Sequence, residues 1–108
     1  MARRLTRGDV YLHRFAKPDK RRPVLVLSRP EAIEVLHEVM VAPITSTIRG
    51  IPSEVVLGSE HGMKVACAVN LDHVQTVRQA DLRRHVTTLD AHVMQLICQA
   101  LSIATGCM

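Results

Sequence analysis

The chain has 108 residues, of which 47% are hydrophobic and 22% are charged, a composition typical of one globular domain and not of a disordered chain. No apolar run approaches the roughly 20 residues of a membrane span, and no apolar segment follows the charged N-terminal residues as it would in a signal peptide. We therefore expect a single domain over residues 1–108, located in the cytoplasm and not in a membrane.

Positive charge is concentrated in the first third of the chain. The net charge is +4, yet residues 1–29 carry nine Lys or Arg side chains against Asp9 and Asp19, a net charge of +7. Such asymmetry favours a polyanionic partner, because a clustered basic surface attracts phosphates. A solvated basic surface without a partner is the alternative interpretation, and charge by itself leaves both open.

The cysteines and histidines give no pattern of a metal or disulfide site. Three widely spaced cysteines, Cys67, Cys98 and Cys107, form neither a disulfide framework nor a zinc-binding pair, and the six histidines are scattered. We expect Cys67 and Cys98 to be small core residues and Cys107 to lie in a terminal tail. The sequence thus predicts no bound metal and no cofactor.

Short apolar runs bounded by Gly, Pro and charged residues predict five or six strands. The strands are expected at residues 10–15, 23–28, 39–44, 53–57 and 65–71, with a weaker one at 85–88. Residues 16–22 are expected to form an exposed loop, and Pro30 can begin a short helical turn over residues 30–38. The continuous apolar run at 23–28 indicates a strand that is buried on both faces.

The last segment is predicted to be a helix with defined ends. Asp90 can cap its N-terminus, and Gly106 stands where a left-handed residue would end it. Apolar residues at helical spacing form one stripe between these ends: Val93, Leu96, Ile97, Ala100, Leu101 and Ala104. The prediction is therefore a mainly β protein, a small β-barrel with a C-terminal helix packed against it.

Two strand ends carry groups suited to phosphate. Arg22 precedes Pro23, which favours an extended backbone for Arg22 at the start of a buried strand. The strand at 39–44 ends in three hydroxyls, Thr45, Ser46 and Thr47, and Arg49 follows. Hydroxyls, backbone N–H groups and a guanidinium together can bind a phosphate. If the two strands are neighbours, Arg22 and Thr45 meet at one rim.

These segments, taken in order, resemble the MazF/PemK toxin family. The matching segments read RGDVY at residues 7–11, RPVLVLS at 22–28, APITST at 42–47, EVVL at 54–57 and LDHVQTV at 71–77, followed by the capped helix. Each segment alone is a weak signal, but their order across nearly the whole chain is specific.

The resemblance implies an SH3-like (CcdB/PemK-like) β-barrel and the activity of a toxin in a toxin–antitoxin pair. That activity is sequence-specific, metal-independent cleavage of single-stranded RNA by attack of a 2′-hydroxyl, which leaves 2′,3′-cyclic phosphate and 5′-hydroxyl ends. It also implies a homodimer and a cognate antitoxin protein, MazE-like or similar, as partners.

By position, the resemblance implies that Arg22 and Thr45 are catalytic and that Asp72 is the candidate general base. Further residues are expected to contact RNA: Lys20, Arg21, Ser28, Ser46, Thr47, Arg49, His73 and Gln75.

The sequence departs from the family pattern at three places. Asn70 stands where PemK-like members have an arginine, and the common Asp-Gln-x-Arg segment reads DHVQ at 72–75. The loop at 16–21 is also shorter than usual. His73 introduces a titratable ring near the expected site; a plain RNA contact is the interpretation we adopt for it, in preference to a proton donor.

Two other classes of function are alternatives to the ribonuclease. A CcdB-like toxin inhibits DNA gyrase by binding and uses a C-terminal tryptophan, whereas this chain has no tryptophan. A passive nucleic-acid module needs aromatic side chains for base stacking, and only Tyr11 and Phe15 are aromatic here. The sequence therefore favours the endoribonuclease.

Overall fold

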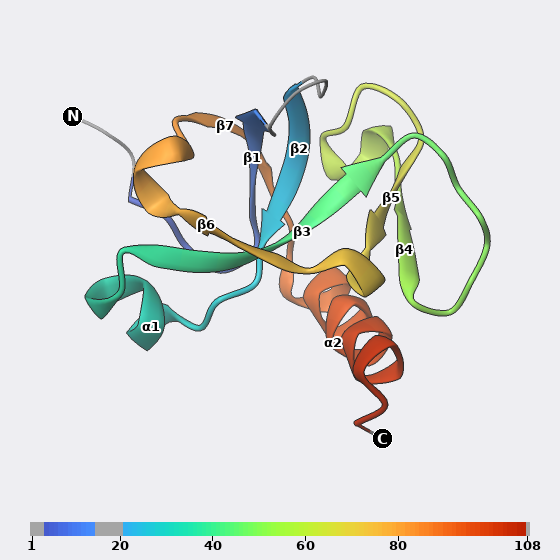
Figure 1. Cartoon of the computed structure of the whole chain (residues 1–108). Helices are drawn as coiled ribbons and strands as arrows, with labels where there is room; N and C mark the ends of the chain where they lie inside the picture. The colour runs from blue at the N-terminus through green and yellow to red at the C-terminus, as the bar shows by residue number, and fades with distance from the viewer. Residues whose placement is uncertain (1–3, 15–20, 108) are drawn as a thin grey trace.

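The computed structural model describes residues 4–14 and 21–107, with seven strands, two α-helices and three 3₁₀ turns (Figure 1). The strands are β1 (Asp9–Arg14), β2 (Arg21–Val26), β3 (Glu38–Thr45), β4 (Glu54–Leu57), β5 (Cys67–Asn70), β6 (Gln75–Arg78) and β7 (Arg84–Thr88). The helices are α1 (Pro30–Val35) and α2 (Ala91–Thr105), and the 3₁₀ turns are η1 (Ser59–His61), η2 (Leu71–His73) and η3 (Gln79–Asp81).

The strands form one curled antiparallel sheet, a half-barrel with the C-terminal helix packed against it. Their order is β4-β5-β3-β2-β1-β7, and β6 pairs with β3 outside this path. The long strand β3 changes partners along its length: it pairs with β6 over residues 38–41, with β2 over 41–43 and with β5 over 44–45. This architecture confirms the predicted mainly β fold with a C-terminal helix, and Figure 1 shows β3 running through its centre.

Alternation along the strands divides the core into two clusters. In β2, Val24 and Val26 belong to one cluster, while Leu25 belongs to the other, and all three are fully buried. A strand that points side chains alternately to two buried faces needs apolar residues at every position. The prediction that the 23–28 run is buried on both faces is confirmed.

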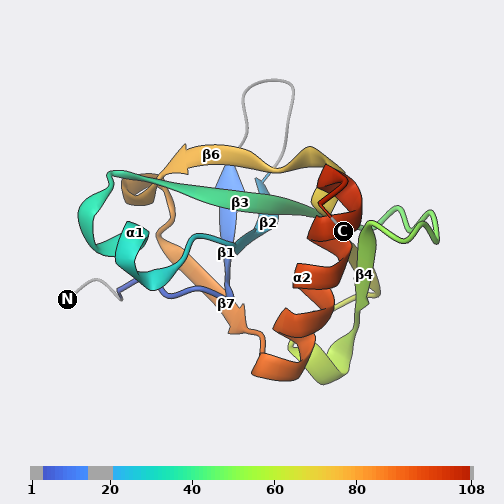
Figure 2. The ribbon, with the colours of Figure 1, turned by 90° about the horizontal axis from the view of Figure 1, so that it is seen from below.

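Helix α2 begins and ends at the residues that the sequence indicated. The Asp90 side chain accepts a hydrogen bond from the Val93 backbone N–H at 2.9 Å, and Gly106 adopts a left-handed φ of 72°. Its buried residues are Val93, Ile97 and Ala100. These pack over β4 and η2, and Figure 2 shows α2 lying alongside β4, with α1 toward the other end of β3.

The segment Arg7-Gly8-Asp9 connects the start of β1 by hydrogen bonds to Thr6, Leu27 and Thr88. The buried carboxylate of Asp9 accepts hydrogen bonds from the Thr6 backbone N–H at 2.9 Å and from the Thr88 hydroxyl at 2.7 Å. The Arg7 guanidinium donates to the Leu27 carbonyl. This part of the resemblance therefore reflects how the sheet is held together.

Several expected boundaries and burials are corrected by the structure. The sequence QTVR of β6 was not predicted as a strand, because it has a single apolar residue and no alternation. The expected strand at 65–71 is shorter, since the chain turns into η2 at Leu71. On α2, Cys98 is exposed and Leu96 is 40% exposed, because both lie beside the buried stripe and not within it. Neither α1 nor α2 is long and apolar enough to cross a membrane, and the described chain has no other α-helix.

Candidate functional site

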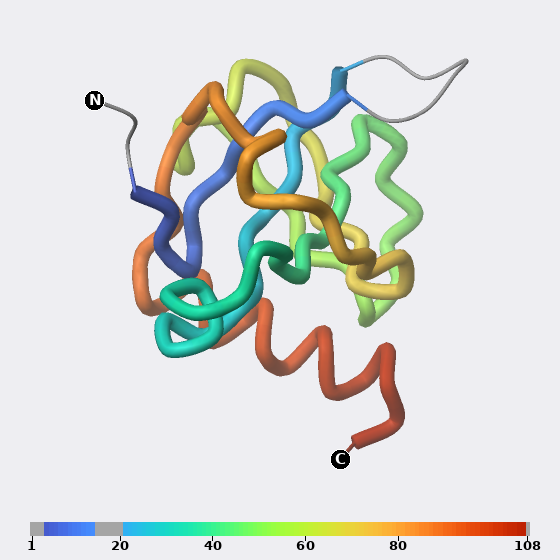
Figure 3. The backbone as a smooth tube through the Cα atoms, turned by 60° about the vertical axis from the view of Figure 1, so that its left-hand side comes forward, coloured from blue at the N-terminus to red at the C-terminus, as the bar shows by residue number. Residues whose placement is uncertain are grey.

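A cavity of about 860 Å³ opens where β2, β3 and β7 end or begin, and we call it the main cavity. Its lining includes the start of β2, the end of β3 with the turn that follows, residues 62–65, Asn70, His73 and the start of β7. Figure 3 shows the β3–β4 connection, which carries part of this lining, on the opposite side of the molecule from the N-terminus. The cavity thus lies at strand ends, outside the hydrophobic core, where polar side chains can remain in contact with water.

Arg22 and Thr45 each lie two residues beyond the last pair that β2 and β3 form. The last pair that these strands form is Val24 with Pro43. Beyond this pair the two strands have other partners: Arg22 pairs with His13 of β1, and Thr45 pairs with Ala68 of β5. The Arg22 and Thr45 side chains both line the main cavity, as expected from the two strand ends.

The turn after β3 presents hydroxyls from an ordered backbone. The Thr45 Oγ1 atom accepts a hydrogen bond from the Thr47 backbone N–H at 3.1 Å, which leaves the Thr45 hydroxyl proton available to donate. The backbone N–H groups of Arg49 and Gly50 donate to the Glu54 carboxylate at 3.0 and 3.1 Å. The Glu54 carboxylate thus stabilises the turn through its backbone, and the side chains of the turn remain available to contact a ligand.

Ser46, Thr47, Arg49 and Arg21, which the resemblance implies as RNA contacts, also line the main cavity. The lining carries five cationic side chains in all, namely Arg21, Arg22, Arg49, Lys64 and Arg84. Hydroxyls beside several cations form a site suited to an anion.

Asn70 and His73 form a hydrogen-bonded pair in the lining. Asn70 is 6% exposed, and its Oδ1 atom accepts from the Asp72 backbone N–H at 3.0 Å. Its Nδ2 atom lies 3.1 Å from His73 Nδ1, so the amide donates and Nδ1 accepts. In the neutral ring the proton is then on Nε2. Asn70 therefore orients the ring of His73.

The structure does not bring three of the predicted residues to the main cavity. Ser28 is 4% exposed, and its hydroxyl accepts from the Met40 backbone N–H at 2.8 Å; six residues of extended chain, about 20 Å, separate it from Arg22. The Asp72 carboxylate accepts a 2.5 Å hydrogen bond from the Ser53 hydroxyl. Gln75 begins β6 opposite Val41. Lys20 lies outside the described residues.

The second wall of the cavity was not predicted from the sequence. Leu12, Lys64, Val65, Arg84 and His85 line it, and no motif in the sequence indicated a role for them there. The one residue in the sequence that could have indicated this wall is Gly62. A glycine with a φ of 86° permits residues 62–65 to approach β7 closely, and Thr87 is its neighbour there.

Cys67 also borders the cavity, but its thiol is buried. Burial raises the pKa of the Cys67 thiol above its ordinary value, so the sulfur stays protonated and unreactive near neutral pH. Among residues 4–14 and 21–107, no three His, Cys, Asp or Glu side chains come together as a group that could hold a metal ion.

The structure is that of a small β protein, a curled antiparallel half-barrel with guanidinium groups and hydroxyls lining one cavity suited to an anion such as phosphate. The chain belongs to the MazF/PemK family: residues 6–105 match the family described as PemK-like, MazF-like toxin of type II toxin–antitoxin system.

Relatives of known class support this assignment. The chain is 46% identical over 103 residues to the probable endoribonuclease MazF5 of Mycobacterium tuberculosis, covering 94% of this chain and 93% of that protein. It is 37% identical over 90 residues to the endoribonuclease MazF3 of the same species, covering 83% and 87%. Among solved structures, the Mycobacterium tuberculosis toxin MazF-mt6 superposes with a TM-score of 0.82 at 33% identity, covering 91% of this chain and 96% of that one. The chain is therefore a MazF-like endoribonuclease toxin of a toxin–antitoxin system.

Proposed function

We propose that this endoribonuclease cleaves single-stranded RNA at short preferred sequences, without a metal ion, by intramolecular attack of a ribose 2′-hydroxyl. The observation that supports it most directly is that Arg22 and Thr45 line one cavity together with further cations. The ribose 2′-oxygen forms a bond to phosphorus, the bond from phosphorus to the 5′-oxygen breaks, and the 5′-oxygen takes up a proton. The products are a 2′,3′-cyclic phosphate and a 5′-hydroxyl.

Arg22 and Thr45 supply what this reaction requires at the phosphate. Negative charge grows on the non-bridging phosphoryl oxygens in the transition state, and fixed donors that meet it lower the barrier. A guanidinium donates two parallel, charge-assisted hydrogen bonds, and the Thr45 hydroxyl adds a third donor whose oxygen is already oriented by Thr47. Because DNA lacks the 2′-hydroxyl, the chemistry itself selects RNA.

The proton of the 2′-hydroxyl needs a separate acceptor, because arginine remains protonated. Asp72 is the proposed base, by its position in the family pattern. Its neighbours Asn70 and His73 line the main cavity, while its own carboxylate is bonded to Ser53. Catalysis through Asp72 requires this carboxylate, which does not line the main cavity, to reach the bound 2′-hydroxyl, and the pH–rate profile of Asp72→Asn tests whether it is the base.

The proposal includes a protein partner. A solved structure described as an endoribonuclease in complex with its cognate antitoxin, from a mycobacterial species, superposes with a TM-score of 0.84 at 25% identity, covering 94% of this chain and 95% of that one. We infer that a cognate antitoxin covers the main cavity and excludes RNA, and that the toxin itself acts as a homodimer in the cytoplasm, where its substrate is made.

The decisive experiment compares two RNA oligonucleotides that share a cut site mapped on total RNA. One is unmodified, and the other carries a single 2′-deoxy substitution on the nucleotide before the cut. In EDTA, the first should yield 5′-hydroxyl and cyclic phosphate ends, and the second should bind without being cut. Ends with a 5′-phosphate would show that water is the nucleophile, and cutting that stops in EDTA and returns with magnesium would show that a metal ion takes part.

A further inference from the structure

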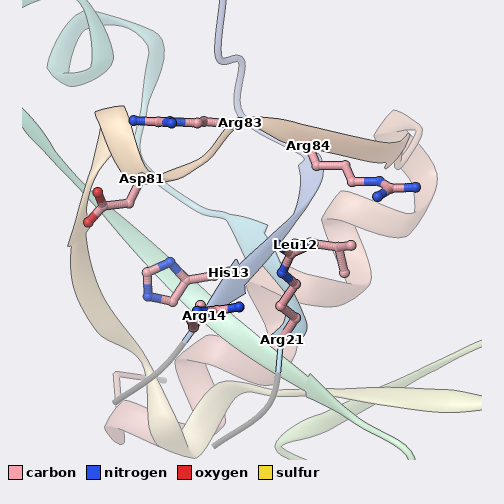
Figure 4. A pocket seen from close by; sticks show the side chains of 7 residues that line it. All are labelled: Leu12, His13, Arg14, Arg21, Asp81, Arg83 and Arg84. Carbon is pink, nitrogen blue, oxygen red and sulfur yellow. The ribbon is translucent and has the colours of Figure 1, made fainter. Parts of the chain in front are cut away.

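A second cavity, of about 590 Å³, lies beside the main cavity and is strongly basic. We call it the arginine cavity: its polar lining consists of Arg14, Arg21, Arg83 and Arg84, with His13 and Asp81 (Figure 4). The sequence indicated a role for Arg21 alone among these residues. The cavity therefore needs an explanation of its own.

The sheet register fixes where these arginines stand. Arg14 and Arg21 are paired across β1 and β2, so their side chains leave neighbouring strand ends. Arg84 is paired with Leu12 across β1 and β7. Arg83 is anchored by a hydrogen bond from its Nε atom to the Ala80 carbonyl at 3.2 Å. In Figure 4, Arg83 extends to the Asp81 side of the cavity and Arg84 to the Leu12 side.

The charges of the cavity are not balanced within the described chain. Its one carboxylate, Asp81, is engaged by Arg78, whose Nη2 atom lies 3.2 Å from Oδ1. In the described ranges, no carboxylate lies within ion-pair distance of Arg14, Arg21, Arg83 or Arg84. Four guanidinium groups that always carry charge repel one another, and their exposure to water reduces this repulsion without removing it. A bound anion would relieve it, which is the feature expected of a ligand site.

We propose that the arginine cavity binds a backbone phosphate of the RNA that flanks the cut, on one side only. The inference rests on the proposed cleavage of single-stranded RNA. Leu12, Arg21 and Arg84 line both cavities, so a strand that leaves the main cavity at this wall enters the arginine cavity directly. Guanidinium forks match the geometry of phosphate oxygens, and a ladder of phosphates spans two adjoining basic cavities better than an isolated acidic side chain does.

The test uses Arg14 and Arg83, which line the arginine cavity and not the main one. The double variant Arg14→Gln/Arg83→Gln is compared with Arg29→Gln, which removes an exposed cation that lines neither cavity. Three fluorescent RNAs share the mapped cut site: a short one, one extended at the 5′ end and one extended at the 3′ end. Thermal melting of every variant checks that the fold is retained.

We expect one of the two extensions to raise kcat/KM for the wild-type protein and for Arg29→Gln. The double variant should lose that gain, while it cuts the short RNA as the wild type does. With 2′-deoxy-blocked RNAs, the slope of log Kd against log salt for the favoured extension should fall by about 0.7 for each phosphate that the double variant no longer binds.

Two results would overturn the proposal. In the first, the double variant keeps the full gain from both extensions. In the second, it loses only the binding of an acidic antitoxin peptide, which would assign the cavity to a protein partner. If no RNA is cut by any variant, the proposed cleavage fails instead, and the salt dependence of binding to the blocked RNAs still decides whether the arginine cavity holds a flanking phosphate.

Discussion

Gly62 connects the stability of the fold to the shape of the main cavity, and replacing it with alanine gives a quantitative test. Its φ of 86° lies in the left-handed region, and a Cβ atom built there would stand 2.4 Å from Thr87 Oγ1 and 2.9 Å from Thr87 Cβ. Thr87 cannot simply turn away at no cost, because its hydroxyl donates to the His61 carbonyl at 3.1 Å.

The expected loss has two parts. A left-handed backbone costs a residue with a Cβ atom roughly 1–2 kcal/mol. Displacing Thr87 forfeits its hydrogen bond, worth about 1 kcal/mol. The sum for Gly62→Ala is about 2–3 kcal/mol, which lowers the melting temperature of a chain this size by roughly 10–20 °C.

Gly50→Ala is the matched control. Gly50 has a φ of 72°, but a Cβ atom there would meet no atom within 4 Å, so only the left-handed cost of roughly 1–2 kcal/mol applies. Thermal and urea unfolding followed by circular dichroism should therefore rank Gly62→Ala below Gly50→Ala, with both below the wild type. Equal losses in the two variants would refute the reasoning that the approach of Gly62 to Thr87 is energetically significant.

The remaining predictions concern the chemistry. Arg22→Ala should slow cleavage by about 10²-fold or more with the fold intact, and Arg22→Lys should restore it only in part, since a point charge lacks the planar fork; single-turnover rates on one oligonucleotide measure both. Thr45→Val, nearly isosteric, should also be slow, and full activity in both Arg22→Ala and Thr45→Val would refute the proposed site. Asp72→Asn should flatten the acidic limb of the pH–rate profile if Asp72 is the base, whereas an unchanged profile with lower thermal stability would assign Asp72 to its bond with Ser53. Because burial raises the pKa of Cys67, a thiol reagent at neutral pH should label the two exposed cysteines of the folded protein and leave this one unlabelled, as mass spectrometry of the digested product would show.

Those parts of the fold that depend on local pattern could be predicted from the sequence. The buried run of β2 and the capped helix α2 each carry a strong, short-range signal: unbroken apolar residues in one, and Asp90 and Gly106 at the two ends of the other. Such signals depend on residues close together in the sequence, so they hold however the rest of the chain folds.

Features that depend on distant neighbours could not be read in the same way. Strand β6 is held by its pairing with β3, which lies more than thirty residues earlier in the chain, and its own sequence shows no alternation. The exposure of Cys98 depends on which face of α2 meets β4 and η2. Ser28 was expected at the site because it belongs to the same short segment as Arg22, but Arg22 lies near the start of β2 and Ser28 lies past the far end of this extended strand.

The position of the main cavity follows from two prolines. Pro23 and Pro43 have no backbone N–H, so neither strand can donate to a ladder at these positions. The pairing of β2 with β3 ends at Val24 and Pro43, and β3 then pairs with β5 through Ile44 and Thr45. Beyond the prolines, β2 and β3 are free to diverge, and the space between their ends is where the cavity lies. The residues just past the break, Arg22 on one strand and Thr45 on the other, both line this cavity. The end of the β2–β3 pairing at these prolines thus leaves a cation and a hydroxyl in the lining of one cavity, which is the arrangement that the proposed phosphate site needs.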